Sequence, residues 1–141
     1  MEEMSRRSAL ALGLAATAAT PLLGLATPAR ARDYGPTEGT EIAPGVRVVD
    51  VGTWKSDDMT GVKSINVVDV VFQPGATDIE SVMEQDMICH ITAGEFTIKK
   101  ADREFNVKEG EYYTCGKGKT DHATNISNVV GVHRVAILMP A

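Results

Sequence analysis

Short runs of alternating apolar and polar residues follow one another from residue 46 to the end of the chain. In residues 95–100, Phe96 and Ile98 share one face, whereas Thr97 and Lys99 share the other. This period of two is typical of a strand with one buried face. Comparable runs cover residues 46–51, 65–72, 87–92, 104–107, 112–115, 121–126 and 129–139. With glycine and proline between the runs and no convincing helical period, the pattern predicts an all-β sandwich or barrel.

The first 31 residues have a different pattern. Arg6 and Arg7 precede an uncharged run over residues 8–29, and residues 29–31 form an A-x-A cleavage site. Paired arginines ahead of a weakly apolar segment resemble a twin-arginine export signal. A membrane anchor is the alternative, because about 20 apolar residues can span a bilayer. The cleavage site and Pro21 favour removal, so we expect a periplasmic protein with residues 1–31 as its signal peptide.

Removal of the signal would leave residues 32–141, enough for one domain with a single core. The whole chain has 14 basic and 19 acidic residues, of which three arginines and two glutamates lie in the signal. The remainder therefore has 11 basic and 17 acidic side chains, a net charge of −6. An acidic domain without a basic cluster argues against nucleic acid or an anionic membrane as partner. Residues 32–45 are polar and contain Pro36, which predicts an extended arm before the barrel.

Two cysteines remain after this removal, Cys89 and Cys115. An oxidising periplasm favours a disulfide between them. Export in the folded state would instead leave a buried pair reduced. The spacing does not decide between these alternatives, because it gives no distance between the two residues in space.

Several glycines and their neighbours occur at the spacing of a known family. Residues 72–77, Gly94 with Glu95, Gly110 with Glu111, and Asn125 resemble the cupin family of small jelly-roll barrels. The resemblance implies a single cupin-like barrel over residues 46–141. It also implies a small-molecule ligand inside the barrel and a homodimer formed through exposed sheet edges.

The positions of the usual cupin metal ligands are occupied by other residue types. In the first motif, Gly75 and Gly94 match, while Ser81 and Met83 stand at the histidine positions and Met87 at the glutamate position. In the second motif, Gly110, Gly118 and Asn125 match, Gly116 replaces proline and Asp121 replaces histidine. A hydroxyl, two thioethers and one carboxylate are a poor set for a divalent transition metal. We therefore expect no metal at the usual cupin site and no cofactor.

A softer metal is the alternative. An unbroken strand over residues 81–89 would place Met83, Met87 and Cys89 on one face, and such ligands suit Cu(I). A loop at residues 84–86 would break this register. The simpler interpretation is that methionine and cysteine fill an irregular core.

Three residues are candidates for acid–base chemistry without metal: Asp121, His133 and Tyr113. His133 shares a face with Val135 and Ile137, which favours an inward position, although such a histidine is often only a hydrogen-bonded core residue. A one-residue bulge would turn His122 toward the cavity as well. The predicted cavity is formed by Ser81, Met83, Met87, Cys89, Asp121, His122 and His133.

Two classes of function follow from these residues. The first is an exported small-molecule-binding or accessory protein that lacks the usual cupin metal site. The second is a periplasmic cupin enzyme, either a metal-free isomerase or lyase that uses Asp121 and His133, or a copper-dependent protein that uses Met83, Met87 and Cys89. The sequence leaves open whether the protein is an enzyme.

Overall fold

The described part of the protein is built of strands. A computed structural model describes residues 32–141, so the predicted signal peptide lies outside the described residues. This part has ten strands and no helix, which confirms the predicted all-β class. Accordingly, residues 32–141 include no helix of the length and hydrophobicity that crossing a membrane requires. The strands are β1 (Thr40–Ala43), β2 (Val46–Lys55), β3 (Val62–Phe72), β4 (Ser81–Val82), β5 (Met87–Ala93), β6 (Glu95–Lys100), β7 (Glu104–Lys108), β8 (Tyr112–Cys115), β9 (Thr120–Asn125) and β10 (Gly131–Pro140).

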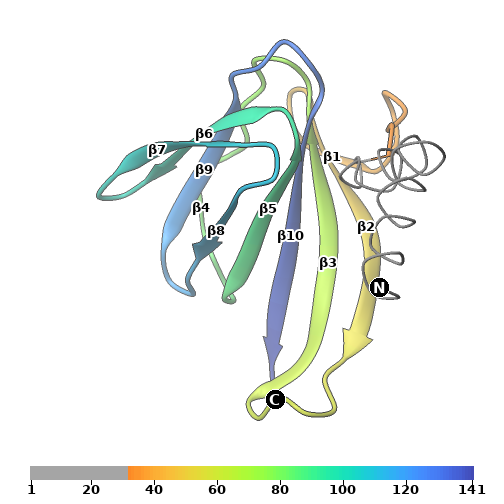
Figure 1. Ribbon diagram of the computed structural model, residues 1–141, viewed down its shortest axis with the longest axis vertical. Helices are drawn as coiled ribbons and strands as arrows, with labels where there is room; N and C mark the ends of the chain where they lie inside the picture. Colours follow the sequence, from red (N-terminus) through yellow and green to blue (C-terminus); the bar gives the residue numbers. More distant parts are fainter. Residues whose placement is uncertain (1–31) are drawn as a thin grey trace, which may run out of the picture. The chain divides into compact units, whose positions relative to one another are not determined.

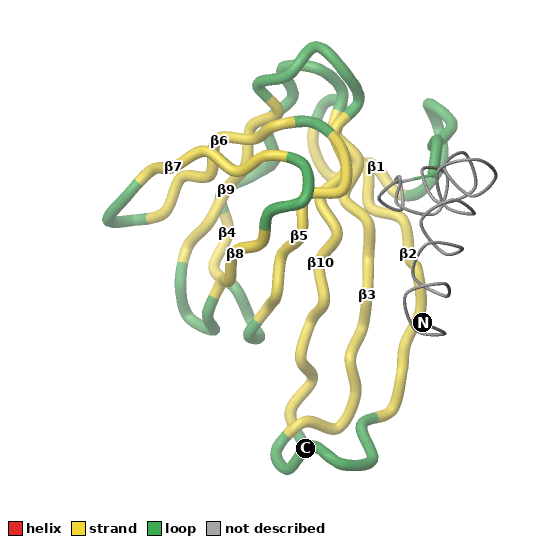
Figure 2. The backbone as a smooth tube through the Cα atoms, viewed as in Figure 1, coloured by secondary structure: helices red, strands yellow, loops and turns green. Residues whose placement is uncertain are grey.

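The strands form two antiparallel sheets (Figures 1 and 2). The larger sheet has the order β1-β2-β3-β10-β5-β8, and the smaller sheet has the order β4-β9-β6-β7. The last strand, β10, lies between β3 and β5, so distant parts of the sequence are neighbours in the sheet. Figure 1 shows that β2, β3 and β10 extend well beyond the smaller sheet. The smaller sheet therefore covers only part of one face of the larger sheet.

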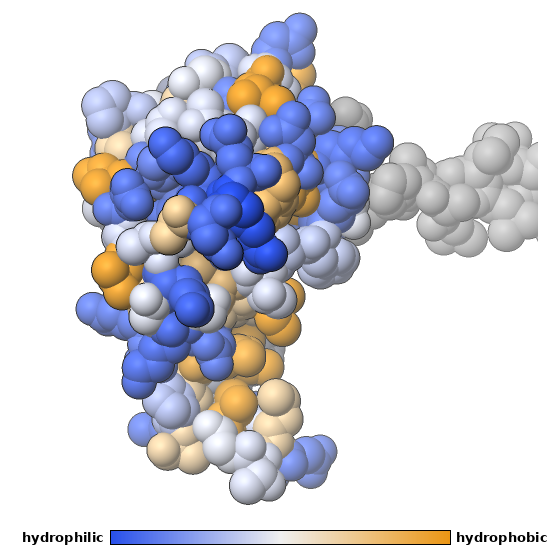
Figure 3. Space-filling view, turned by 90° about the vertical axis from the view of Figure 1, so that its left-hand side faces the viewer, coloured by the Kyte–Doolittle hydropathy of each residue, from blue (hydrophilic) through white to orange (hydrophobic). Residues whose placement is uncertain are grey.

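The core lies between the two sheets. Phe72, Ile91, Phe96 and Ile98 are completely buried there. The rings of Phe72 and Phe96 meet edge to face, with centroids 4.9 Å apart, an arrangement that aromatic pairs favour. Gly131 makes room for this pair, since a Cβ atom at that position would lie 2.5 Å from the Phe96 ring. Outward side chains are mostly polar, and hydrophilic residues cover much of the face in Figure 3.

Asn125, the last match to the second cupin motif, has a structural role. Its buried side chain donates hydrogen bonds to the carbonyl oxygens of Phe72 at 3.2 Å and Val129 at 2.8 Å. Its Oδ1 atom accepts a hydrogen bond from the backbone N–H of Ser127 at 3.0 Å. The side chain thus joins the end of β3 to the turn before β10, which brings the two central strands of the larger sheet together.

The predicted N-terminal arm is partly a strand of the larger sheet. Thr40–Ala43 form β1, which pairs with β2, and Ala43 lies in the core. The alternation of apolar and polar residues did not indicate this strand, because it is only four residues long and only Ala43 is buried. The arm therefore ends before residue 40.

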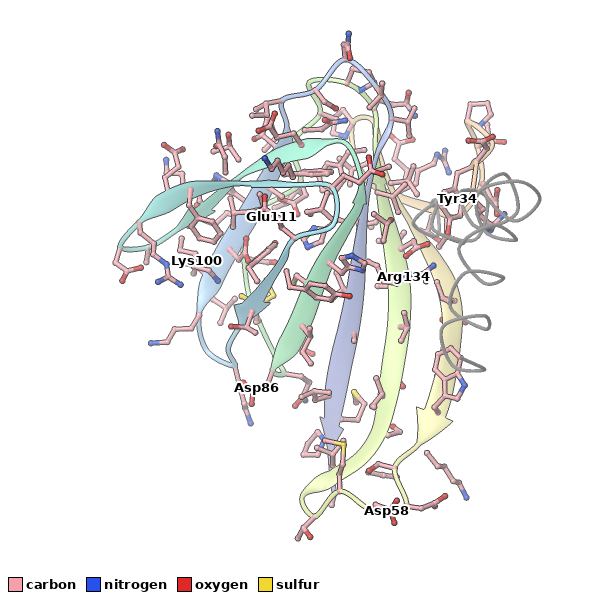
Figure 4. All side chains as sticks on the ribbon, viewed as in Figure 1. Tyr34, Asp58, Asp86, Lys100, Glu111 and Arg134 are labelled. Carbon is pink, nitrogen blue, oxygen red and sulfur yellow. The ribbon has the colours of Figure 1, made fainter. Side chains whose placement is uncertain are left out.

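The segment before β1 is held on the outer face of the larger sheet by a hydrogen bond from Tyr34 to the buried side chain of Asp69. Asp69 on β3 and Arg134 on β10 are cross-strand partners. The Arg134 guanidinium donates two hydrogen bonds to the Asp69 carboxylate, at 2.7 and 2.8 Å, and the Tyr34 hydroxyl donates a third. Figure 4 shows Tyr34 and Arg134 on this side of the sheet. Asp69 is only 1 % exposed, so its charge depends on these partners.

Replacing Arg134 with Met should lower the free energy of unfolding by about 1–3 kcal/mol, because Asp69 would stay buried without its main charged partner. Urea denaturation followed by circular dichroism measures this change. Lys63→Met, at an exposed position of the same sheet, is the matched control and should have little effect. Equal stabilities of the two variants would contradict the role of the ion pair.

Candidate functional site

A cavity of about 230 Å³ lies between the two sheets. Its lining is mainly apolar and rich in sulfur. Branched aliphatic side chains form one part of the wall: Ile42, Val68, Val70, Val135 and Ile137. Sulfur-containing side chains form another: Met83, Met87, Cys89 and Cys115. The polar groups of the wall are Asp78, Ser81, Tyr113, Asp121 and His133.

The structure brings six of the seven predicted cavity residues together, and His122 is the exception. Strand β9 pairs with β6 in regular register, so the bulge that would turn His122 inward is absent. Asp121 and Ala123 are buried, whereas His122 between them is only half-buried. The His122 Nδ1 atom lies 3.8 Å from a carboxylate oxygen of Glu80, which is exposed. The placement of His122 in the cavity is therefore corrected: its side chain belongs to the opposite face of β9.

Met83 lines the cavity from a loop and not from the unbroken strand that the copper alternative assumed. Residues 83–86 form a loop between β4 and β5, so no unbroken strand runs from residue 81 to residue 89. The loop is held by two backbone hydrogen bonds to the β8–β9 turn, from Met83 N to Lys119 O at 2.9 Å and from Gly118 N to Met83 O at 2.8 Å. Met83, Met87 and Cys89 consequently line one cavity although the strand register fails.

Cys115 adds a fourth sulfur atom that sequence analysis had considered only as a disulfide partner. Met87 and Cys115 are cross-strand partners on β5 and β8. Cys89 and Cys115 are both free and buried in the structure. Burial raises the pKa of the Cys89 thiol to about 12 and also raises the pKa of the Cys115 thiol.

Tyr113 and His133 form a neutral hydrogen-bonded pair in the cavity wall. The Tyr113 hydroxyl lies 3.0 Å from His133 Nε2. Burial lowers the pKa of His133 to about 4, and burial also raises the pKa of Tyr113. Both groups are therefore uncharged near neutral pH, in a position to pass a proton between them or to hydrogen-bond a ligand.

Asp121 is engaged with Lys100, a residue that sequence analysis missed. Both side chains are almost fully buried, and Lys100 Nζ lies 3.5 Å from Asp121 Oδ2. Lys100 Nζ also donates a hydrogen bond to the carbonyl oxygen of Thr114 at 3.1 Å. Its inward position could have been predicted from the sequence, because Lys100 lies on the same face of β6 as the inward residues Phe96 and Ile98. The two predicted proton carriers thus have different partners: Asp121 pairs with Lys100, and His133 with Tyr113.

Asp78 is a second cavity carboxylate that the sequence did not reveal. It lies in the irregular segment before β4, next to the exposed Ile79 and Glu80. Its Oδ1 atom accepts a hydrogen bond from the Ala123 N–H at 2.8 Å. Burial raises the pKa of Asp78 to about 6, and the nearby Asp121 carboxylate adds to this effect. Asp78 is consequently a group that changes charge close to neutral pH.

The usual cupin metal ion does not fit the residues of this cavity. The side chains at its ligand positions carry one hydroxyl, two thioethers and one carboxylate, whereas iron, manganese, nickel and zinc favour imidazole and carboxylate. Within residues 32–141, no three His, Cys, Asp or Glu side chains are grouped so that they could hold a metal ion.

The sequence matches no family model, and no curated protein is similar to it. Solved structures, in contrast, share its architecture. KdgF from a Halomonas species is 17 % identical, with a TM-score of 0.56 over 70 % of this chain and 84 % of that chain. An RmlC-like cupin from Shewanella frigidimarina is 14 % identical, with a TM-score of 0.56 over 77 % of this chain and 89 % of that chain. The cupin domain of Cnp3 from Schizosaccharomyces pombe is 13 % identical, with a TM-score of 0.53 over 77 % of this chain and 70 % of that chain.

These likenesses establish the class of the protein. The chain is an all-β jelly-roll protein with the cupin fold, as the motif spacing predicted. At such low identities the likeness concerns the fold alone, and function has to be argued from the residues of the cavity.

Replacing Asp78 with Asn should change the pH dependence of stability. The folded-state pKa of Asp78, about 6, exceeds the ordinary value of 3.8. Burial therefore costs the folded state nothing below about pH 4, where the carboxyl group is protonated in both states. That stability is lost as the pH rises through about 6 and the buried group becomes charged. The variant should be more stable than the wild type by about 1–2 kcal/mol at about pH 7.5 and equally stable at about pH 4.

Urea denaturation at a series of pH values measures this difference in unfolding free energy. Asp102→Asn, at an exposed turn position, is the control and should show no pH-dependent difference. If Asp78→Asn is less stable than the wild type at about pH 7.5, the charged carboxylate does not destabilise the folded protein, and the prediction is wrong.

Proposed function

We propose that this protein is an exported cupin-fold protein that binds a small, mainly apolar molecule in the barrel cavity, without the divalent metal ion of the usual cupin site. The lining of the cavity is the observation that carries the proposal. Nine of its 14 side chains are aliphatic or contain sulfur, and five polar groups are available to orient a ligand. Apolar concave sites with a few polar groups are typical of small-molecule binding.

The volume of the cavity limits the size of the ligand. Sites for drug-sized molecules usually measure about 300–1,000 Å³, and this cavity measures about 230 Å³. The polar groups limit the chemistry further: Lys100 offsets the Asp121 carboxylate, His133 and Tyr113 are neutral, and Asp78 changes charge as the pH passes its pKa of about 6. The site therefore favours a molecule of few heavy atoms with an apolar body and a hydrogen-bonding group.

Export and assembly belong to the same proposal. The sequence of residues 1–31 supports removal of a signal peptide and a periplasmic location. The acidic charge supports a small-molecule partner over nucleic acid or an anionic membrane. The edge strands, β1 and β8 in the larger sheet and β4 and β7 in the smaller sheet, offer surfaces for a homodimer.

Normal alcohols from butanol to decanol provide a test of the cavity. Each added CH₂ group should strengthen binding by about 0.8 kcal/mol, roughly fourfold in the dissociation constant, until the chain fills the cavity and the gain stops. Calorimetry or NMR titration measures the series. Val68→Phe, which places a larger ring in the cavity wall, should weaken binding at least tenfold.

Val67→Phe is the matched control, because Val67 precedes Val68 and lies on the opposite face of β3. It should leave alcohol binding unchanged. Absence of binding to the wild-type protein, or equal binding to the wild type and Val68→Phe, would exclude the cavity as the ligand site.

A metal-free proton-transfer enzyme is the second candidate. The 3.0 Å contact between Tyr113 and His133 favours it, because the two groups face the same cavity as Asp121. In this role Tyr113 would donate a hydrogen bond to a carbonyl oxygen, while His133 or Asp121 would accept a proton from the adjacent carbon. Reactions of the isomerase and lyase type need these two steps.

Deuterium exchange at the carbon atoms next to the carbonyl of cyclohexanone, followed by NMR in D₂O, tests this chemistry. The wild-type protein should accelerate exchange, and Tyr113→Phe should reduce the acceleration by about 10²-fold or more. Tyr112→Phe, at the exposed neighbouring position, should retain it. Equal exchange with and without protein would leave binding as the function of the cavity.

A further inference from the structure

The sulfur side chains of the cavity come from two segments that are distant in sequence, residues 83–89 and Cys115. Met87 and Cys115 face each other across β5 and β8, and directly paired side chains have Cβ atoms about 4.5–5.5 Å apart. Cys89 lies two residues further along β5, on the same face. Met83 is held in place by the loop that bonds to the β8–β9 turn. All four side chains line the same cavity.

We propose that Met83, Met87, Cys89 and Cys115 form a binding site for monovalent copper, Cu(I). Thiolate and thioether sulfur are soft ligands and select Cu(I) over harder divalent ions. This site goes beyond the binding of an apolar molecule and does not depend on it. It uses four sulfur atoms from the loop, β5 and β8, and one of the two cysteines supplies the thiolate.

The charges of such a complex suit an apolar cavity. When Cu(I) binds, one thiol loses its proton to solvent and a copper–sulfur bond forms, so the positive ion and the thiolate neutralise each other. The thioethers of Met83 and Met87 add neutral ligands, and Cys89 lies beside them as a further sulfur donor. Either Cys89 or Cys115 can supply the thiolate, since both thiols line the cavity. A neutral complex avoids the cost of a buried unpaired charge.

Four of the six sulfur-containing side chains among residues 32–141 line the cavity. The cluster of fully packed residues around Phe72, Ile91, Phe96 and Ile98 includes no methionine or cysteine among residues 32–141. Both cysteines of the chain lie at the cavity instead. Met83 and Met87 are only partly buried, so an ion can reach them from the cavity side.

Anaerobic titration of the reduced full chain with Cu(I), in competition with the colorimetric chelator bicinchoninate, tests the site. The wild-type protein should take one equivalent of copper from the chelator and release one proton for each ion bound. Met83→Leu/Met87→Leu and Cys115→Ser should each weaken binding at least tenfold. Met59→Leu, an exposed methionine outside the cavity, is the matched control and should bind as the wild type does.

Methionine-to-leucine changes conserve volume, and thermal unfolding of the apo-proteins confirms that the variants are folded. Retention of tight binding by the double methionine variant would overturn the four-sulfur site, since thiols alone would then suffice. Failure of the wild-type protein to compete with bicinchoninate, or stronger binding of Zn²⁺ than of Cu(I), would also overturn it. Alcohol binding measured on the same protein separates the two proposals, because loss of copper binding alone leaves the apolar ligand site intact.

Discussion

Contact between the two sheets through Phe72 and Phe96 is the constraint on which the rest of the structure depends. Phe72 ends β3 and Phe96 lies on β6, so their edge-to-face contact joins the larger sheet to the smaller one. Gly131 leaves room for the ring of Phe96, and Asn125 ties the end of β3 to the turn before β10. Once these elements are fixed, the inward faces of β3, β10 and β5 converge on the smaller sheet. The cavity is the part of the interface between the sheets that the rings of Phe72 and Phe96 leave unfilled.

The chemistry of the cavity follows from what surrounds each polar group. Asp121 pairs with the buried side chain of Lys100, whereas burial and the Asp121 carboxylate raise the pKa of Asp78 to about 6. His133 and Tyr113 satisfy each other and stay neutral. The wall thus combines one compensated charge, one titratable acid and one neutral proton-sharing pair. This combination suits the proposed small ligand and the proposed proton transfer.

Replacement of the usual cupin ligands changes which ions the barrel can hold. At Ser81, Met83 and Met87, the positions that resemble the cupin ligand positions, the chain has a hydroxyl and two thioethers in place of two imidazoles and a carboxylate. The same cavity gains two thiols from Cys89 and Cys115. Such a lining does not suit hard and borderline divalent ions, whereas the proposed soft monovalent ion would find four sulfur atoms there. If the copper proposal holds, the cupin fold would hold a different ion in its cavity through a change of side chains alone.

Strand periodicity and glycine spacing determined much of this protein from the sequence alone: the all-β class, the cupin fold, and six of the seven residues proposed for the cavity. These features are local, because parity fixes the face of a strand and a turn fixes where the strand ends. Other features required the tertiary structure. The polar segment at residues 40–43 is a strand because β2 offers it an edge, and His122 faces outward because β9 keeps a regular register with β6. Contacts between distant segments decide the remaining features. They pair Lys100 with Asp121, and they place Asp78, Cys115 and Met83 in the wall of the cavity. No local pattern encodes such contacts, since only the packing of one sheet on the other brings those side chains together.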